Sequence, residues 1–263
     1  MSDFQTLRVE IAPPFAQITL NRPSTRNAMN FEMVDELYAL FVGMKERADI
    51  RAVVIGGANG HFCSGGDIGD LAQAASMTPD EQNAVTTRLD SMLRAVNTAP
   101  QIVIARLEGA VLGGGFGLAC VSDIAVSADN ASFGLPEVRL GLAPALIAPF
   151  VIQRIGITQA RRLMLTGERF NGHKALAYGL IHEVVAHADL AIRIESLLNE
   201  IRQCAPNAIR VIKSLIHESA AKSLDETVAY RAQLLNTIRG GDEGQEGMSA
   251  FLGKRPARWV DAP

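Results

Sequence analysis

The sequence predicts an α/β fold that ends in a helical C-terminal region. Short β-like runs, several of which end in glycine-rich turns, lie at residues 16–20, 52–55, 102–107 and 124–126. Helical patterns lie between these runs, and strands that alternate with helices are typical of α/β proteins. After about residue 190 the strand pattern disappears and only helical patterns follow.

Two of the predicted helices have clear starting signals. The segment Phe31–Met44 has apolar residues at a spacing near 3.6, and Asn30 before it is a suitable N-cap. A second helix starts after Thr78, where Pro79 takes the first helical position and Glu81 completes a capping box. Both helices lie between predicted strands and therefore support the fold class.

The C-terminal segment has the pattern of amphipathic helices at residues 190–201, 208–218 and 224–238. Ser223 and Glu226 form a capping box at the start of the last of these helices. Helices with wide apolar faces need a partner surface. We therefore expect a β-rich core at residues 1–190 and a helical region at residues 191–263 that packs on the core and on neighbouring subunits.

Composition limits the partners and the compartment. The chain has 263 residues and is 48% hydrophobic, which allows a large core. Its net charge of −3 argues against nucleic acid as the main partner. Cys63, Cys120 and Cys204 have no CxxC spacing, which is typical of a reduced protein. The N-terminus lacks a secretory pattern, and no segment has the length and apolarity of a membrane span. We expect a cytoplasmic protein that binds no membrane.

Two glycine-rich turns are the best candidates for a ligand site. The first is HFCSGGDI at residues 61–68, and the second is GAVLGGGFGLA at residues 109–119, which leads into a predicted helix near Gly114. Each turn alone could simply allow tight strand–helix packing, and neither fits a nucleotide-binding motif. Together they could supply two N–H donors, an oxyanion hole for a carbonyl that becomes an enolate.

A third candidate element is the segment FGLPEVRLGLAP at residues 133–144. Glu137 stands there among apolar residues, where loss of solvation would raise its pKa towards the range of a general acid–base group. The alternative is a surface turn on which Glu137 pairs with Arg139. The segment by itself does not decide between the two.

Taken together, these elements resemble the enoyl-CoA hydratase/isomerase (crotonase) family. The resemblance is carried by NRP at 21–23 with NAMN at 27–30, FCSGGDI at 62–68, GGG at 113–115 and FGLPE at 133–137. It extends to GLIHEV at 179–184 and to EGMSAFLGKR at 246–255, and so covers nearly the whole chain. The resemblance implies a spiral of ββα units, a C-terminal helical trimerisation region, and a homotrimer or homohexamer.

The resemblance also implies roles for individual residues. Glu137 is the expected acid–base group, and the amides of Gly66 and Gly114 are the expected donors to a thioester oxygen. Lys254 resembles a lysine that reaches the coenzyme from a neighbouring subunit, although it could equally be a solvated lysine of the tail. The other residues expected along the coenzyme A part of the substrate are Arg26, Ala28, Ser64, Gly65, Asp67, Ile68 and Gly69. Coenzyme A belongs to the substrate, so no separate cofactor is expected, and the histidines show no metal-ligand spacing.

One departure from the family pattern concerns the number of carboxylates. Hydratases of the standard type carry a second glutamate in the GGG helix, at the position that is Gly117 here. On a helix, position 117 lies near the same face as Gly114, so a carboxylate there would be expected to reach the site. A lone Glu137 is compatible with hydration, and also with proton transfer between carbons in a Δ3,Δ2-enoyl-CoA isomerase.

The segments PALIAPFVI at 144–152 and RRLMLTGERF at 161–170 resemble hydratases of branched or 3-substituted enoyl-CoAs. The nearest activities are isohexenylglutaconyl-CoA and methylglutaconyl-CoA hydration, in terpene and leucine breakdown. The hypothesis is therefore an enoyl-CoA hydratase of this kind, with isomerisation, non-catalytic acyl-CoA binding and RNA binding as alternatives. We expect residues 72–92 and 143–151 to set the depth of the acyl pocket. Lesser candidates are Cys63 as a nucleophile and Glu108 as a substitute carboxylate.

Overall fold

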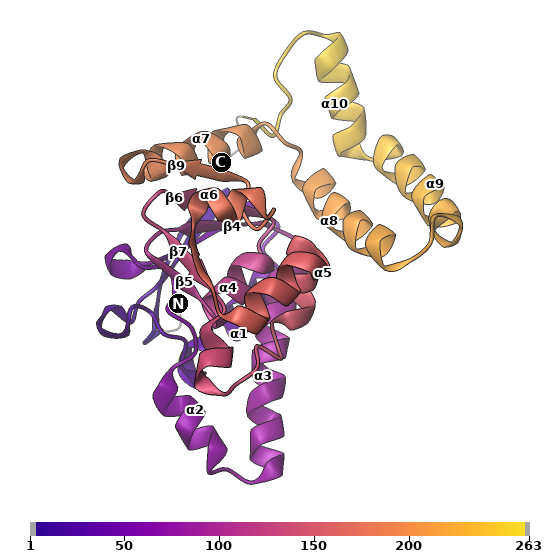
Figure 1. Ribbon diagram of the computed structural model, residues 1–263. Coiled ribbons are helices and arrows are strands. Elements are labelled where there is room, and N and C mark those ends of the chain that lie inside the picture. The colour runs from indigo at the N-terminus through magenta and orange to yellow at the C-terminus, as the bar shows by residue number, and fades with distance from the viewer. Residues whose placement is uncertain (1–3, 261–263) are drawn as a thin grey trace.

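Two β-sheets form the centre of the computed structural model, which describes residues 4–260 (Figure 1). The larger sheet has the strand order β1-β2-β3-β4-β6-β9, and the smaller has the order β5-β7-β8. Together the strands are β1 (Leu7–Ala12), β2 (Phe15–Leu20), β3 (Ala52–Gly57), β4 (Ile102–Leu107), β5 (Ala110–Leu112), β6 (Ile124–Ala128), β7 (Ser132–Gly134), β8 (Arg169–Asn171) and β9 (Glu183–Val185). The predicted α/β fold is confirmed.

The larger sheet is parallel from β2 to β9, and its central strands β3, β4 and β6 are largely buried. Only β1 joins it antiparallel, through a tight connection to β2. In β3 every residue is buried, with Val53 and Ile55 in the main core and Ala52 and Val54 in a second cluster on the opposite face. Parallel strands covered on both faces read as continuous apolar runs, which is why β3 was visible in the sequence.

The helices cover these sheets and supply the walls of the site. Their bounds are α1 (Phe31–Met44), α2 (Ile68–Ala75), α3 (Pro79–Asn97), α4 (Gly114–Cys120), α5 (Ala148–Thr166), α6 (Gly172–Ala177), α7 (Leu190–Arg202), α8 (Pro206–Ala221), α9 (Leu224–Gly240) and α10 (Asp242–Leu252). The predicted caps are confirmed: Asn30 accepts a hydrogen bond from Met33 N at 3.0 Å, and Thr78 and Glu81 form the capping box of α3. Local side-chain chemistry thus fixes where these helices begin.

Helix α4 is buried beside β5 and carries the second glycine-rich turn at its start. Phe116 and Leu118 are fully buried, and the Phe116 ring meets Phe170 of β8 edge-on, with 6.3 Å between the ring centroids. Phe170 also stacks on Phe133 of β7 at 5.8 Å. This aromatic cluster holds α4 against the smaller sheet, so the N-terminus of α4 has a fixed position.

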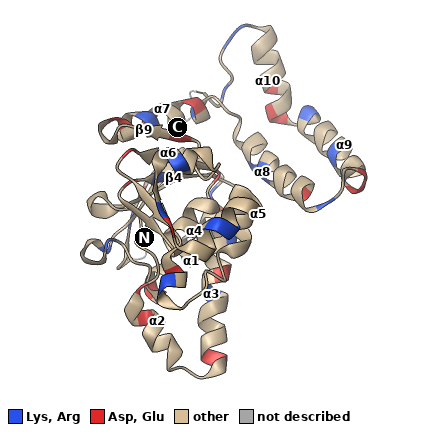
Figure 2. Cartoon of the chain, in the orientation of Figure 1, with Lys and Arg blue, Asp and Glu red and all other residues tan. Residues whose placement is uncertain are grey.

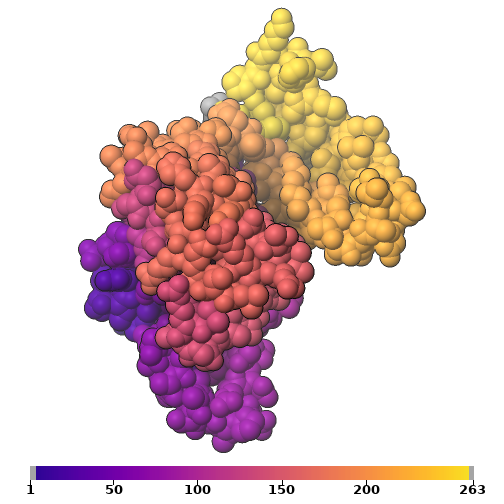
Figure 3. Space-filling model, in the orientation of Figure 1, coloured from indigo at the N-terminus to yellow at the C-terminus, as the bar shows by residue number. Residues whose placement is uncertain are grey.

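The C-terminal helices form two parts. Helix α7 covers the second face of the larger sheet through Leu190, Ile194, Leu197 and Ile201, whereas α8–α10 project from the core as an arm (Figures 1 and 3). The expected boundary near residue 190 therefore falls at the start of α7, and the projecting part starts at Pro206. Residues 1–3 and 261–263 of the two expected regions lie outside the described range. Between residues 4 and 260 there is no helix with the length and apolarity needed to cross a membrane.

A buried lysine fastens the arm to the larger sheet. Lys213 Nζ of α8 donates to the Gln101 carbonyl at 2.8 Å and to Asp123 Oδ2 at 2.7 Å. Asp123 Oδ2 also accepts from Val103 N of β4 at 2.6 Å. Burial lowers the pKa of Lys213, and Asp123 opposes this effect by favouring the charged ammonium.

Replacing this lysine tests its contribution to stability. Lys213→Met removes the ammonium that the Gln101 carbonyl and the Asp123 carboxylate share, so we expect a loss of about 2 kcal/mol. For a chain of this size that loss lowers the Tm by about 5 °C. The matched control is Lys222→Met, which removes an exposed pair with Glu218 and should change the Tm by no more than about 1 °C. Equal shifts in the two variants, measured by scanning calorimetry, would contradict the assignment.

Candidate active site

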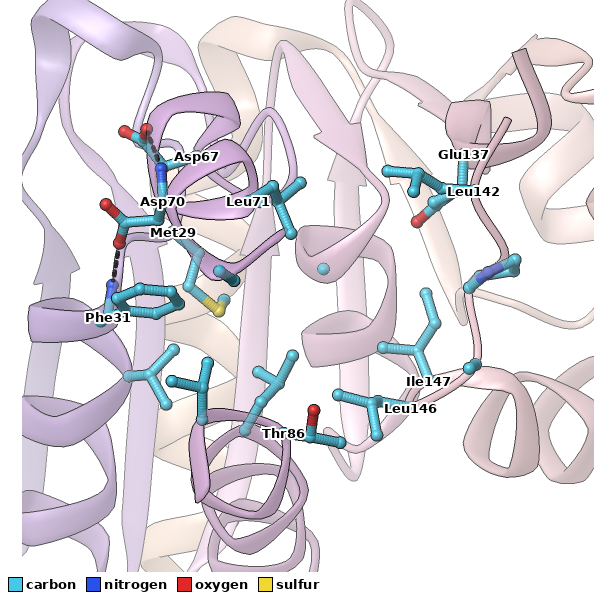
Figure 4. A pocket seen from close by; sticks show the side chains of 18 of the residues that line it. Met29, Phe31, Asp67, Asp70, Leu71, Thr86, Glu137, Leu142, Leu146 and Ile147 are labelled. Atoms are coloured by element: carbon cyan, nitrogen blue, oxygen red, sulfur yellow. Dashed lines mark hydrogen bonds between the residues drawn. The ribbon is translucent and has the colours of Figure 1, made fainter. Parts of the chain in front are cut away.

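A cavity of about 500 Å³ opens between the α2–α3 hairpin, the start of α4 and the segment that follows Glu137 (Figure 4). Most of its lining is apolar, as is usual for sites that take small organic ligands. The larger apolar side chains are Met29, Phe31, Val34, Leu71, Val85, Leu89, Leu142, Leu146 and Ile147. Lining residues come from both segments that the sequence led us to expect, 72–92 and 143–151.

The first glycine-rich turn is docked on the strand-like segment at Met29. Met29 N donates to the Gly65 carbonyl at 2.8 Å, and Asp67 N donates to the Met29 carbonyl at 2.9 Å. These two hydrogen bonds are made by Gly65 and Asp67, the neighbours of Gly66 in the chain. The N–H of Gly66 itself has no acceptor in the part of the chain that the structure describes. Gly65 has a φ of +112°, which a side chain would oppose. The turn therefore leaves the Gly66 amide free at the cavity wall.

The second turn brings another free amide to the same wall. Gly114 is the first residue of α4, so its N–H has no acceptor within the helix, and the positive end of the helix dipole lies there. A Cβ atom placed on Gly114 would lie 3.9 Å from the Gly66 nitrogen. The two residues predicted to form the oxyanion hole thus lie together, and both line the cavity.

Glu137 faces this wall from a 3-10 helix, η3 (Pro136–Leu140). A Cβ atom on Gly113 would lie 2.9 Å from Glu137 Oε1, which places the carboxylate against the start of α4. Its Oε2 atom is buried without a hydrogen-bond partner, and burial raises the pKa of Glu137. The alternative pairing with Arg139 does not occur, since Arg139 packs near Gly167 instead.

Gly117 lies against Ile147, a residue that lines the cavity. A Cβ atom on Gly117 would lie 2.3 Å from Ile147 Cγ2, so a side chain at position 117 would clash with Ile147 in its present position. The expectation that a carboxylate at this position would reach the site stays a prediction, and it would require Ile147 to move. The helix periodicity indicates which face of α4 position 117 lies on. It does not show that Ile147, thirty residues later in the chain, packs against that face.

The residues expected along coenzyme A lie in the segment 26–28, in the turn 64–69 and, for Lys254, on the arm. Ser64 N donates to the Arg26 carbonyl at 3.1 Å, which holds residues 26–28 beside the turn 64–69 at the edge of the cavity. Asp67 pairs with Arg22 at 2.8 Å and caps α2 through Gly69 N, so its carboxylate fixes the turn. Lys254 is exposed on the arm beyond α10 and does not line the cavity of its own chain.

The lesser candidates lie in environments that do not support catalysis. Cys63 is fully buried against Gly115, and burial raises the pKa of its thiol to about 11, which disfavours the nucleophilic thiolate. Glu108 forms an ion pair with Arg106 and a hydrogen bond with His187, and it does not line the cavity. Among residues 4–260, no three His, Cys, Asp or Glu side chains are grouped as metal ligands would be.

Two features of the site were not identified from the sequence. Gly113, the N-cap of α4, has a φ of +48° and makes room for Glu137. Arg22 holds Asp67 and also donates to the Ala28 carbonyl at 2.6 Å. The GGG run signalled the first feature, whereas no spacing rule joins positions 22 and 67.

This fold and site define a crotonase-like protein, and comparison with known proteins gives the family. The chain belongs to the enoyl-CoA hydratase/isomerase family, whose model matches residues 10–262. It is 32% identical to the probable enoyl-CoA hydratase of Mycobacterium bovis over 258 residues, which are 98% of each chain.

Solved structures agree with this family. The AtuE protein of Pseudomonas aeruginosa has 47% identity and a TM-score of 0.95, with 98% of this chain and 100% of that chain covered. An enoyl-CoA hydratase/isomerase of Marinobacter aquaeolei has 41% identity and a TM-score of 0.94, with the same coverage. The crotonase fold is thereby confirmed.

The burial of the cysteines can be tested by alkylation. Burial raises the pKa of Cys63 to about 11 and that of Cys120 to about 12, whereas Cys204 is exposed. We expect iodoacetamide at pH 8 to modify Cys204 in the folded protein and to leave the other two intact until the chain is unfolded. Peptide mass spectrometry reads the result. Rapid modification of Cys63 with loss of activity would restore the nucleophile hypothesis.

Proposed function

We propose that this chain is an enoyl-CoA hydratase in which Glu137 is the acid–base residue. The observation that carries the proposal is the buried, unpaired Oε2 of Glu137, which shares a cavity with the free amides of Gly66 and Gly114. Hydration of an enoyl thioester needs these two elements, because charge develops on the thioester oxygen while a proton moves at the neighbouring carbons.

The first step uses the two amides and the carboxylate together. With the thioester oxygen held by Gly66 N–H and Gly114 N–H, the β-carbon becomes electrophilic. Glu137 takes a proton from water as the water oxygen bonds to the β-carbon, and the electron pair of the double bond moves to give the enolate. Donors of this kind typically stabilise such a transition state by about 3 kcal/mol each.

The second step returns the proton. Glu137, now protonated, delivers its proton to the α-carbon while the enolate collapses to the saturated thioester. The sum is the addition of one water, and the carboxylate is regenerated. Because the same group is first base and then acid, a raised pKa serves both steps. Burial supplies that pKa shift without another charged group.

The apolar walls support a branched or 3-substituted acyl group as the substrate class. Across the cavity from Glu137, helices α2 and α3 contribute Leu71, Val85 and Leu89 to the lining. Figure 4 shows Glu137 and Ile147 on one side of this space and Met29 and Phe31 on the other. The resemblance of residues 144–152 and 161–170 to hydratases of 3-substituted enoyl-CoAs points to the same class.

An isomerase is the second candidate, and the lone carboxylate favours it. Proton transfer from one carbon to another needs a single base and no bound water. Measurement of the product mass separates the two activities, since hydration adds the mass of one water and isomerisation adds nothing. Binding of acyl-CoA without any product would instead support the non-catalytic alternative.

The role of Glu137 can be tested by substitution and by pH. We expect Glu137→Gln to lower kcat/KM by at least about 100-fold while coenzyme A binding persists, because a positioned proton-transfer group is lost. In the wild type, water activation needs the carboxylate form of Glu137. Burial raises its pKa, so kcat/KM should be retained at high pH and lost as pH falls through a midpoint above the ordinary value of 4.5.

The matched control is Glu10→Gln, which alters an exposed glutamate on β1 and should leave both the rate and the pH profile unchanged. Near-normal turnover by Glu137→Gln would reject the assignment. An acid midpoint at or below 4.5 would show that Glu137 is not held in the desolvated state described above.

We further propose that the arm formed by α8–α10 packs against copies of the same chain as a trimer or hexamer. The arm exposes large apolar side chains, with Phe251 and Leu252 of α10 at 84% and 81% exposure and Leu224 of α9 at 78%. Patches of this kind mark interaction surfaces. The arm also carries Lys254, so packing of this kind is the way in which that lysine would reach the cavity of a neighbour.

Assembly is tested by the mass of the protein in solution. The variant Phe251→Ser with Leu252→Ser should lower the molar mass measured by light scattering after gel filtration, because it removes apolar contact area from the interface. Ile192→Ser, at an exposed apolar position of α7 outside the arm, is the control and should keep the wild-type mass. A double variant with the mass of the wild type would contradict the proposal.

A further inference from the structure

Ile147 is the buried end of the loop that closes one side of the cavity. Its exposed fraction is 4%, and it lines the cavity as the residue that precedes α5. Its carbonyl accepts from Val151 N at 3.0 Å, and the Pro144 carbonyl accepts from Ala148 N at 2.9 Å. Ile147 is therefore held on the first turn of a helix, and its side chain has little freedom to move away from the site.

The side chain of Ile147 fills the space in front of Gly117. A Cβ atom on Gly117 would lie 2.3 Å from Ile147 Cγ2 and 2.8 Å from Ile147 Cβ. The β-branched side chain of Ile147 fits here because position 117 is a glycine. At this point Ile147 lines the cavity, whereas Gly117 does not.

This aliphatic wall lies next to the acid–base residue. Along α4, Glu137 approaches Gly113 and Ile147 approaches Gly117, positions that are about one helical turn apart. In Figure 4 the side chains of Glu137 and Ile147 follow one another along the same side of the cavity. An acyl chain that extends from the two amides past Glu137 would next meet Ile147.

We propose that Ile147 is a specificity-determining residue, which packs against an apolar substituent on the β-carbon of the enoyl-CoA. This inference rests on the proposed hydratase function and assigns its preference for 3-substituted substrates to one side chain. An aliphatic group offers no hydrogen bond to water or to a polar substituent, so a polar group placed there would lose its solvation. An alkyl group at the same place gains contact with the wall.

The test compares two substrates that differ only in the β-methyl group, hex-2-enoyl-CoA and 3-methylhex-2-enoyl-CoA. The quantity measured is the ratio of kcat/KM for the methylated compound to kcat/KM for the plain one. Ile147→Ala removes most of the wall, so we expect this ratio to fall about 10-fold, the scale for loss of contact with a small apolar group. Ile147→Val should give a smaller fall.

A near-isosteric pair keeps the test valid if the alanine variant folds poorly. Ile147→Val and Ile147→Thr have similar size, and the threonine places a hydroxyl on the wall. The ratio should be lower in Ile147→Thr than in Ile147→Val, with thermal unfolding as the check that both are folded. A ratio unchanged from the wild type in the folded variants would overturn the inference while the hydratase function stands. A wild-type protein that hydrates neither compound would overturn the proposed function, and this inference with it.

Discussion

The contact between the Gly65–Gly66 turn and the first turn of α4 is the constraint on which the site depends. It brings two chain segments close enough that a Cβ atom on Gly115 would lie 2.6 Å from Cys63 Cβ. Only glycine fits such a contact, and only this contact places the Gly66 and Gly114 amides on one wall. The larger sheet and the Phe116–Phe170–Phe133 cluster hold α4 in position. Packing of the core therefore fixes the positions of the two hydrogen-bond donors.

The second constraint is desolvation, which couples the pocket to the chemistry. The apolar lining that suits an acyl chain also withholds hydrogen-bond partners from Glu137 Oε2, and the resulting loss of solvation raises the pKa of Glu137. Polar side chains at the rim behave differently. Asp67 is paired with Arg22 and Asp70 accepts from Phe31 N at 2.6 Å, so both carboxylates have structural partners. Glu137 is the carboxylate of the cavity that is left available for proton transfer among the described residues.

The sequence was informative where structure depends on local chemistry and less so where it depends on distant contacts. The caps at Asn30, Thr78 and Ser223 are set within a few residues, and the buried strands read as apolar runs, so these elements were predictable. The three-residue strands β5, β7, β8 and β9 are too short to show a period. Strand β1 was also missed, although its residues alternate in burial. Within the site, the glycine runs and Glu137 could be predicted because they belong to a sequence motif. The contact between Gly117 and Ile147 could not be predicted, because it joins residues with no such motif.

The contact between Gly117 and Ile147 also explains why the site is stable with a single carboxylate. Ile147 fills the space that a second side chain would need at position 117. If Gly117 alone were replaced by a larger residue, the new Cβ atom would clash with Ile147, and overpacking of a buried site is destabilising. If Ile147 alone were made smaller, a void would open beside Glu137, and the carboxylate would become more hydrated or the wall would collapse. The two positions therefore constrain each other, and both bear on the environment of Glu137. One carboxylate and an aliphatic wall are therefore compatible with each other. In the proposed function, Glu137 transfers the proton and the space beside it holds an apolar part of the substrate.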